Sequence, residues 1–525
     1  MLRKASSIAL LAVFVVASAR PVASNWKLPG SPPTAPRNSR EGETSPELRR
    51  QSFDIVWKTI KEKHFDPQLG GVDWDAVRQK YLPRIGEAKT DIEFYDLLQQ
   101  MLGELHESHF AVYPPDALPD DDAREPRSGT VGADVRIIDG LAVITRIRPG
   151  SPAARAGLAT GFVIEAIDGT ATGQMLERAS KGSATEGVKV IRQTRAVLAR
   201  LNGDPGTLVE VAYTSRPGTR SVAKITRERL TGEMSARMGN FPPQYVEFDT
   251  RTVQDRIAYV RFNIFVMSIM DRLRSAIRSV HDAEGIIIDL RGNPGGVGQM
   301  SCGLAGMLES AETSLGTMKM RAGFQNFAVF PQSGAYLGPV VVLIDEMSAS
   351  TSEIFAGGMQ SLGRATVVGR RSAGAALPSI LEKLPTGAVF QYAIGDFRTP
   401  KGTLIEGTGV TPDIEVSLNR EALLSGRDPQ LEEAIKAISK SKRSAQQERP
   451  SGNVGFELGS FLDDRTVGAL RFCESGIRKG HDNEEGVNNH SGGIDDMPLR
   501  PGPLPANAIE RNSTGTESSR ATAIR

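Results

Sequence analysis

Apolar residues recur at three- and four-residue spacing near the start of the chain. The stretches SPELRRQSFDIVWKTIKEKHF and DIEFYDLLQQMLGEL both carry this pattern, which is typical of helices with one buried face. We therefore expect a small helical domain over residues 45–115. The segment before it, residues 25–44, is rich in Pro, Ser and charge, and we interpret it as a linker.

The pattern changes between residues 128 and 230. Short runs of β-branched residues alternate with glycine turns in GADVRIIDGLAVITRIRPGSPAARAGLATGFVIEAIDG. Alternation of this kind predicts short strands joined by tight turns. We expect a β-rich domain over 128–230 in which SPAARAGL forms one short helix.

Strands and helices alternate from about residue 255 to residue 426. RIAYVRFN, GIIIDL, PVVVLID and ATVVGR have the composition of buried strands, and IMDRLRSAIRSVH that of an amphipathic helix. This alternation predicts a largely parallel sheet with helices on its faces. We place this core at residues 240–436. The chain then turns to Ser, Gly, Asn, Pro and charged residues, so we expect a disordered tail over 440–525.

The first 24 residues have the pattern of a signal peptide. Arg3 and Lys4 precede a short apolar run at residues 8–16, and Ala17-Ser18-Ala19 supplies an A-x-A cleavage pattern. The run is short for a membrane span, although an uncleaved anchor is the alternative. We expect export to the periplasm or the medium, and no stable membrane span in the mature protein.

Charge and cysteine content narrow the possible partners. The chain has 63 Lys and Arg residues against 62 Asp and Glu, so neither nucleic acid nor an anionic membrane is expected as the main partner. Its two cysteines, Cys302 and Cys473, do not establish a disulfide, and no His/Cys spacing resembles a zinc site. We expect no metal and no cofactor.

Two strand–turn–helix junctions contain candidate chemistry. In IIIDLRGNPGGVGQM, glycines follow a buried strand and allow a sharp turn whose amides point outward. In DEMSASTSEIFAGGM, residues 345–359, three serines stand at alternate positions before a helix. Ser350 and Glu353 match a helix capping box, which is the purely structural explanation. The free amides of a helix start would also suit an oxyanion.

A serine nucleophile needs a base, and the chain has six histidines. His481 and His490 lie in the expected tail, and His281 ends an exposed helix. We expect His64 to be solvated because it follows a run of charges. His106 and His109, in ELHESHF, are the remaining candidates.

Several motifs, taken together and in order, resemble a known family. GELHESHF, GSPAARAGL, DLRGNPGG, LIDEMSASTSEIFAGGMQSLGRATVVG and LIEGTGVTPDIEV are similar to motifs of the S41 serine peptidases, the tail-specific or C-terminal processing proteases. Residues 128–230 resemble a PDZ domain, through the loop SGTVGAD, the GSPAARAGL helix and GFVIEAIDG. The resemblance implies an α/β, crotonase-like spiral core with an N-terminal helical domain and an inserted PDZ domain.

The resemblance also implies a set of site residues. Ser350 matches the nucleophile, and the amide of Thr351 with that of Gly295 or Gly296 would form the oxyanion hole. The lysine of the Ser–Lys members is missing, because Ala375 stands at its position.

The chain matches instead the branch similar to the tricorn protease core. In that branch His109 is the general base, and Ser108 and Glu406 form a relay that orients it. For Glu406, a loop carboxylate that holds a glycine turn is the structural alternative. Lys383 and Lys401 do not match the family lysine, so we expect both at the surface. Activity should then rise through the ordinary imidazole pKa, roughly 6–7.

The sequence therefore predicts an exported serine endopeptidase that cleaves polypeptides through an acyl-enzyme. The PDZ domain would capture substrate C-termini or gate the site, with a β-rich spacer as the structural alternative. Two other functions stay open: an inactive PDZ-containing peptide-binding protein, and a crotonase-type acyl hydrolase.

Overall fold

The structure is a computed structural model that describes residues 44–117, 128–180, 186–216, 218–254 and 256–447. The expected signal peptide at residues 1–24, most of the linker, Cys473, and the tail beyond residue 447 lie outside the described residues. Within the described part, no helix combines the length and apolar character that crossing a membrane requires.

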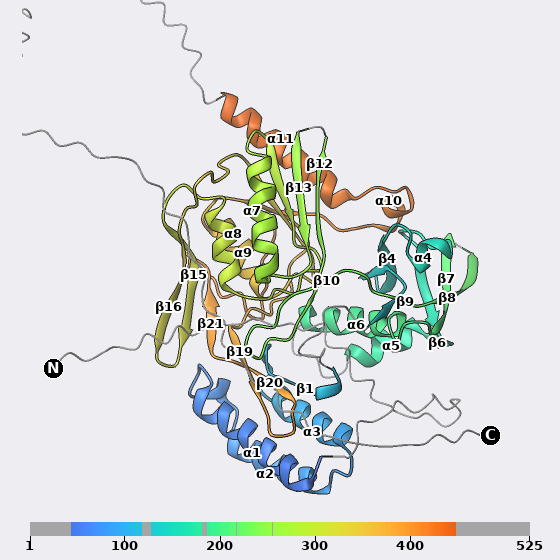
Figure 1. Cartoon of the computed structure of the whole chain (residues 1–525), viewed down its shortest axis with the longest axis vertical. Coiled ribbons are helices and arrows are strands. Elements are labelled where there is room, and N and C mark those ends of the chain that lie inside the picture. The colour runs from blue at the N-terminus through green and yellow to red at the C-terminus, as the bar shows by residue number, and fades with distance from the viewer. Residues whose placement is uncertain (1–43, 118–127, 181–185, 217, 255, 448–525) are drawn as a thin grey trace, which may run out of the picture. The chain divides into compact units, whose positions relative to one another are not determined.

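Three helices form the N-terminal region, as the apolar spacing predicts: α1 (Pro46–Lys63), α2 (Trp74–Glu87) and α3 (Asp91–Gly103). Each begins at a capping side chain, Ser45, Asp73 or Thr90, that accepts a hydrogen bond from a backbone amide of the first turn. Strand β1 (Ala111–Tyr113) follows and pairs with β20 (Val389–Ala393). The helical region therefore lies beside the small three-stranded sheet β1-β20-β19 (Figure 1).

Residues 128–230 form a sheet in the order β3-β4-β5-β7-β8, with β6 added to β5 and β2 paired with β9. The strands are β2 (Gly129–Thr130), β3 (Ala133–Ile138), β4 (Leu141–Ile147), β5 (Val163–Ile167), β6 (Thr170–Ala171), β7 (Leu208–Arg216), β8 (Thr219–Thr226) and β9 (Glu228–Arg229).

This region holds more helix than the sequence predicts. Beside the expected short helix α4 (Pro152–Arg155), it contains α5 (Thr172–Ser180) and α6 (Glu186–Leu201). The expectation of one short helix was wrong because α6 also carries helical spacing. Its buried residues Ile191, Thr194, Val197 and Leu201 recur every three or four positions.

The core contains a six-stranded sheet in the order β12-β13-β14-β17-β18-β22. All neighbouring strands are parallel except the edge pair β12 and β13, which is antiparallel. The strands are β12 (Phe248–Val253), β13 (Ile257–Phe262), β14 (Gly285–Asp289), β17 (Val340–Ile344), β18 (Thr366–Gly369) and β22 (Ile414–Glu415).

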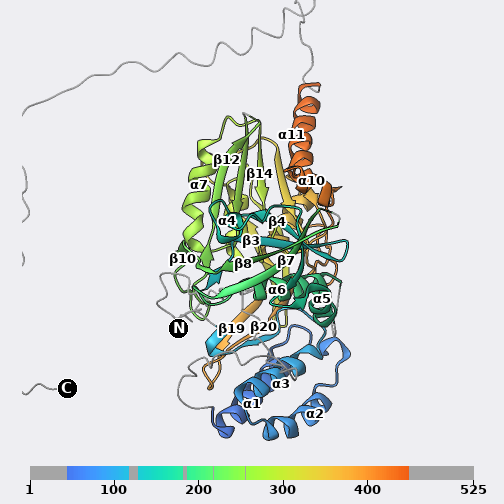
Figure 2. The same cartoon turned by 90° about the vertical axis from the view of Figure 1, so that its right-hand side faces the viewer.

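Helices cover both faces of this sheet, which explains why its central strands are continuously apolar. On one face, Ile287 and Val341 pack against Ala434 and Ile438 of α11 (Pro429–Gln447). Residues of the opposite parity join the large cluster that includes α7 (Met270–Ser279), α8 (Gln299–Gly306) and α9 (Thr351–Ser361). Figure 2 shows α7 and α11 on opposite sides of the strands.

Smaller elements complete the core, and α11 is longer than expected. It ends at Gln447, beyond residue 440 where the sequence predicts the tail to begin, because residues 440–447, KSKRSAQQ, include several good helix formers. The remaining elements are η1 (Leu69–Gly71), η2 (Pro115–Ala117), β10 (Glu233–Met234), β11 (Tyr245–Val246), η3 (Met267–Ile269), β15 (Thr313–Met320), β16 (Gly323–Val329), β19 (Ser379–Lys383), β21 (Gly395–Arg398) and α10 (Arg420–Leu424).

Candidate active site

Ser350 lies in a turn between a buried strand and a helix, and we call residues 345–350 the serine turn. Strand β17 leads into it and α9 begins directly after it. Ser350 is fully buried and has a φ of +57°. A positive φ is uncommon for a residue with a side chain, and such strained positions cluster at functional sites.

A second turn, residues 290–296, faces the serine turn, and we call it the glycine turn. It follows β14, the parallel neighbour of β17, so both turns lie at the carboxyl ends of adjacent strands. Gly295 lies against Ser350, because a Cβ at Gly295 would come within 2.8 Å of the Ser350 Cβ and the Thr351 nitrogen. The hydroxyl of Thr351 also donates to the carbonyl of Gly296 at 2.9 Å. A Cβ at Gly296 would come within 2.2 Å of the Phe265 carbonyl oxygen, so both positions require glycine for close approach.

The two glycine amides that are candidates for the oxyanion hole differ in their hydrogen bonds. The Gly295 amide donates to Asn293 Oδ1 at 2.9 Å. The amides of Gly296 and Thr351, in contrast, have no acceptor among the described residues. These are the two amides left for a ligand.

His109 comes from a loop at the end of the helical region, and we call residues 104–109 the histidine loop. His106 and His109 both have positive φ, +55° and +61°. Strand β1 begins two residues after His109 and pairs with β20, which carries the loop to the core. His109 Nε2 lies 3.2 Å from Ser350 Oγ, within hydrogen-bond distance.

Ser108 and Glu406 stand behind His109. Ser108 Oγ lies 2.7 Å from His109 Nδ1 and donates to Glu406 Oε2 at 2.9 Å. Glu406 also accepts the amides of Ser108 and Ala376, at 2.9 and 2.8 Å. An ionised Glu406 can only accept hydrogen bonds, so the Ser108 hydroxyl donates its proton to Glu406. The Ser108 oxygen then accepts a hydrogen bond from His109 Nδ1–H. The bare Nε2 nitrogen then faces the hydroxyl of Ser350.

Burial controls the charge of this group. It lowers the pKa of His109 to about 3, and the charge of nearby Arg195 acts in the same direction. The expectation of an ordinary imidazole pKa was wrong, because the ring is buried. Burial raises the pKa of Glu406 to about 7, against the hydrogen bonds from Ser108 and Ala376.

Glu353 does more than cap a helix. Its carboxylate accepts the amides of Ser350, Gly374 and Ala375 at 2.9, 2.7 and 3.0 Å, and the hydroxyl of Ser372 at 2.6 Å. The capping relation predicted for Ser350 and Glu353 therefore reaches a second loop. Burial raises the pKa of Glu353 to about 7, against these four hydrogen bonds.

His64 is buried, so the expectation that it is solvated was wrong. Its Nδ1 accepts the amide of Asp66 at 3.0 Å, and its Nε2 lies 2.9 Å from Glu107 Oε2 in the histidine loop. Its ring stacks on Phe65 and Phe110, with centroids 4.6 and 5.3 Å away. The charges that precede it in sequence lie on the exposed side of α1, and the end of the helix turns His64 inward.

Lys383 and Lys401 are exposed, as predicted. Ala375 is buried, and its carbonyl accepts the amide of Ser350 at 2.8 Å. The position of the family lysine therefore lies beside Ser350 but has no side chain to act as a base. Within the described part of the chain, no cluster of three His, Cys, Asp or Glu side chains could hold a metal.

Helix α6 covers the serine turn, which the sequence interpretation missed. Its Ile191 packs with Ala349, Ala373 and Ala375 in a small apolar cluster. Its Gly187 touches the carbonyl of Ala373, since a Cβ there would come within 2.1 Å of that oxygen. The apolar spacing of GVKVIRQTRAVLARL predicts the helix, but no local signal predicts what it covers.

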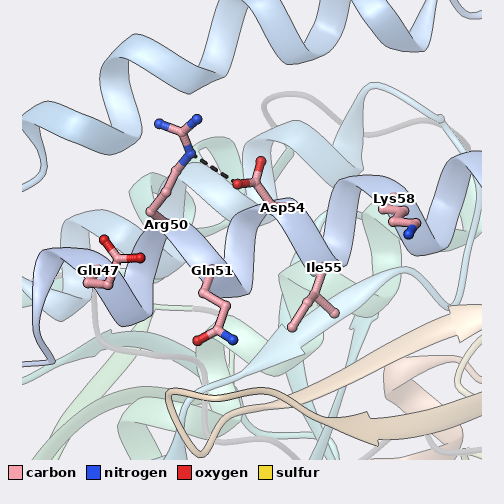
Figure 3. Close-up of a pocket in the computed structure, with 6 residues that line it drawn as sticks. All are labelled: Glu47, Arg50, Gln51, Asp54, Ile55 and Lys58. Atoms are coloured by element: carbon pink, nitrogen blue, oxygen red, sulfur yellow. Dashed lines mark hydrogen bonds and ion pairs between the residues drawn. The ribbon is translucent and has the colours of Figure 1, made fainter.

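An open pocket of about 420 Å³ lies elsewhere, along one side of α1 (Figure 3). Its six lining residues are Glu47, Arg50, Gln51, Asp54, Ile55 and Lys58. They include no serine, threonine or cysteine, and Arg50 and Asp54 are paired with each other at 3.1 Å. This hollow is a feature of the helical surface, separate from Ser350.

Comparison with protein families matches three parts of the chain in order. Residues 45–103 match the tricorn protease C1 domain, residues 143–209 a PDZ domain, and residues 256–416 peptidase family S41. A carboxyl-terminal-processing protease of Picosynechococcus sp. is 28% identical over 368 residues, which cover 68% of this chain and 81% of that protein.

A second relative belongs to the other branch. Tricorn protease homolog 1 of Streptomyces coelicolor is 27% identical over 394 residues, which cover 74% of this chain and 34% of that protein. Among solved structures, the photosystem II D1 C-terminal processing protease has a TM-score of 0.50 at 24% identity, covering 74% of this chain and 97% of that one. A mutant of CPAF has a TM-score of 0.55 at 14% identity, covering 79% and 99%. These two likenesses concern the fold.

A helical N-terminal region, a PDZ domain and a mixed α/β peptidase core define a serine-type hydrolase of peptide bonds. Its core, residues 256–416, matches peptidase family S41, and the carboxyl-terminal-processing protease relative aligns over 68% of the chain.

Proposed function

We propose that this serine peptidase is an exported endopeptidase in which Ser350 is the nucleophile and His109 the general base. The observation that carries the proposal is the 3.2 Å contact between His109 Nε2 and Ser350 Oγ, with Ser108 and Glu406 aligned behind the ring. A nucleophile, a base and an orienting group at hydrogen-bond distance are the geometry of serine hydrolases.

Acylation follows from this geometry. The Ser350 proton passes to His109 Nε2 as Oγ attacks the substrate carbonyl carbon. The carbonyl oxygen becomes negative and is held by the amides of Gly296 and Thr351. His109 then gives its proton to the leaving amine, the C–N bond breaks, and Ser350 remains as an ester. In the second half of the reaction, His109 takes a proton from water, which attacks the ester carbon. The ester bond breaks, the proton returns to Ser350 Oγ, and the carboxylic acid product is released.

The low pKa of His109 makes the relay necessary. A ring that resists protonation holds the Ser350 proton only if the imidazolium is stabilised as it forms. Nδ1–H would donate to Ser108, whose own proton is held by the Glu406 carboxylate. The developing positive charge is thereby connected to a negative group through one hydroxyl.

We further propose that the PDZ domain, at residues 128–230, gates this site and binds polypeptide ends. Helix α6 packs against the serine turn and Ser350 is fully buried, so we expect movement of α6 to open the site to substrate. PDZ domains hold extended peptides beside an exposed strand, and β3 is one of the two edge strands of this sheet. Relatives named carboxyl-terminal-processing proteases support a preference for chain ends.

The nucleophile is tested by labelling with a fluorophosphonate, followed by peptide mapping. We expect the label on Ser350 and none in Ser350→Ala. An inactive peptide-binding protein would not label, and a crotonase-type acyl hydrolase would turn over thioesters but not peptides. Absence of label on Ser350 in a folded protein that cleaves peptides would overturn the assignment.

Export rests on the pattern of residues 1–24. The test is N-terminal sequencing of the protein made in its own host with its full leader. We expect the mature chain to begin after the Ala17-Ser18-Ala19 pattern. A cytosolic protein that begins at Met1 would contradict export without affecting the proposed chemistry.

A further inference from the structure

One buried carboxylate, Asp345, connects the two turns that carry the proposed oxyanion amides. Its Oδ1 accepts the amide of Gly292 in the glycine turn at 2.8 Å. The same oxygen accepts the amide of Met347, in the serine turn, at 3.0 Å. The distance between the turns, and hence between the amides of Gly296 and Thr351, depends on this group.

The cation that balances Asp345 comes from outside the peptidase core. Arg136, on strand β3 of the PDZ region, donates from Nε to Asp345 Oδ2 at 2.7 Å. Its Nη1 donates to the carbonyl of Val135 at 2.9 Å, which fixes the plane of the guanidinium. Arg136 is 7% exposed and Asp345 is 3% exposed, so water screens this pair little.

The fit around Arg136 is close. A Cβ at Gly292 would lie 2.5 Å from Arg136 Nη2, so the guanidinium rests directly on the glycine turn. The neighbouring carboxylate on β3, Asp134, is already bound by Arg146 at 2.6 Å. Arg136 therefore pairs with Asp345 and packs against residues 290–296.

A buried carboxylate without a cation is costly, so Asp345 depends on Arg136. Breaking such a pair from one side is strongly destabilising, because the remaining charge stays buried. The charge would relax by admitting water or by moving the turns, and either would disturb amides that must be fixed before reaction.

We propose that Arg136 is a positioning residue through which the PDZ domain completes the oxyanion hole. The proposal rests on the proposed function of Ser350. It gives the domain two separate contacts with the site: α6 covers the nucleophile, and β3 supports the amides. The PDZ domain is then required even for turnover of substrates that are too small to need recruitment. A domain that acted only as a lid would not be required for these substrates.

The experiment uses the full-length protein and a small activated ester as substrate. Arg136→Met should lower kcat on the ester by about 10- to 100-fold, below the loss for deleting a direct oxyanion donor, with little change in KM. Fluorophosphonate labelling should still reach Ser350, but more slowly by a similar factor. Arg136→Lys keeps the charge without the planar pair of donors, so it should restore part of the rate.

The matched control is Arg155→Met, on α4 of the same domain. Arg155 is paired with Glu228 and its side chain is 54% exposed, so kcat should stay at the parental value. Thermal unfolding of each variant checks the fold. If Arg136→Met does not fold, the rate of Arg136→Lys against the parent is the test.

A double-mutant cycle isolates the pair. If Arg136 acts through Asp345, Asp345→Asn combined with Arg136→Met should be little worse than the poorer single variant. Additive losses, or a kcat for folded Arg136→Met or Arg136→Lys within twofold of the parent, would overturn the proposal. Failure of the parent protein to label at Ser350 would instead overturn the proposed function.

Discussion

The serine turn and the histidine loop meet at one hydrogen bond, but they are built in different ways. The serine turn follows a buried parallel strand, and most of its contacts come from its own helix or from the turn of the neighbouring strand. The histidine loop is held by residues far away in sequence. Glu406 binds Ser108 across 298 positions, and His64 binds Glu107 across 43.

This difference indicates which substitutions should disturb each half of the site. The position of the serine is set mainly by the sheet, so few single substitutions other than those at the Arg136–Asp345 pair should displace it. The position of the histidine depends on two remote contacts and on two residues with positive φ, each of which costs about 1–3 kcal/mol. Remote substitutions should therefore affect the base more than the nucleophile.

Removing the hydroxyl of Ser350 should have the largest effect on the rate. Ser350→Ala should lower kcat on a peptide by about 10⁵- to 10⁶-fold, because no covalent intermediate can form. The side chain is small and the backbone keeps its neighbours, so thermal unfolding should change little. Activity of the variant within tenfold of the parent would contradict the nucleophile assignment.

Removing the base should rank second. His109→Ala should lower kcat by at least 10³-fold, because Ser350 would lose its proton acceptor. Lys383→Ala and Lys401→Ala are the controls and should be nearly silent, since both side chains are exposed. Retained activity in His109→Ala together with loss in either lysine variant would place the base on a lysine.

Glu406 should set the pH dependence, because burial raises its pKa to about 7. Below that pH, a protonated Glu406 can donate to Ser108, which would then donate to His109 Nδ1. The ring proton would move to Nε2, the wrong side for accepting from Ser350. We therefore expect kcat/KM to rise with pH through about 7 as the carboxylate ionises.

Glu406→Gln tests this relay, since an amide cannot ionise. It should lower kcat by about 10²- to 10³-fold and remove the pH limb near 7, and Ser108→Ala should fall in the same range. Glu353→Gln is the comparison, because burial raises its pKa to about 7 as well. A limb that persists in Glu406→Gln but disappears in Glu353→Gln would assign it to the helix cap.

Sequence alone predicts the serine turn well, because its determinants are local. A buried strand, a glycine turn and a capping pair are all visible as short patterns around Ser350. The parallel sheet follows from the same strand and helix alternation. The identities of His109, Ser108 and Glu406 came from the family resemblance, since no local rule brings together residues that lie about 300 positions apart.

The features that the sequence does not predict depend on contacts between parts of the chain that are distant in sequence. The pattern before His64 indicates a charged surface helix, but the ring turns inward where that helix ends. Helix α6 has clear helical spacing, yet its contact with Ala349 depends on how two regions dock. The pKa of His109 is a property of its burial, which only the assembled structure provides.

A remote contact of the histidine loop gives a smaller, more selective effect. His64→Phe keeps an aromatic ring between Phe65 and Phe110 but removes the hydrogen bond to Glu107. We expect kcat to fall by about tenfold, and stability by about 1–3 kcal/mol as the Asp66 amide loses its acceptor. His281→Phe is the control, since that side chain is 71% exposed. An unchanged kcat in folded His64→Phe would mean that Glu406 alone fixes the loop.

The smallest effect on rate should come from within the serine turn itself. Ser348 is fully buried, accepts the amide of Asp345 at 2.9 Å and donates to the carbonyl of Leu290 at 2.8 Å. Ser348→Ala leaves both groups without this partner, so the free energy of unfolding should drop by about 1–3 kcal/mol. The turn keeps the strand, the helix and the other contacts of Asp345, so kcat should stay within tenfold of the parent. Denaturant unfolding and ester turnover, measured on the same sample, separate the two effects. A loss of rate larger than that of His64→Phe, in a folded variant, would show that the serine turn is no more robust than the histidine loop.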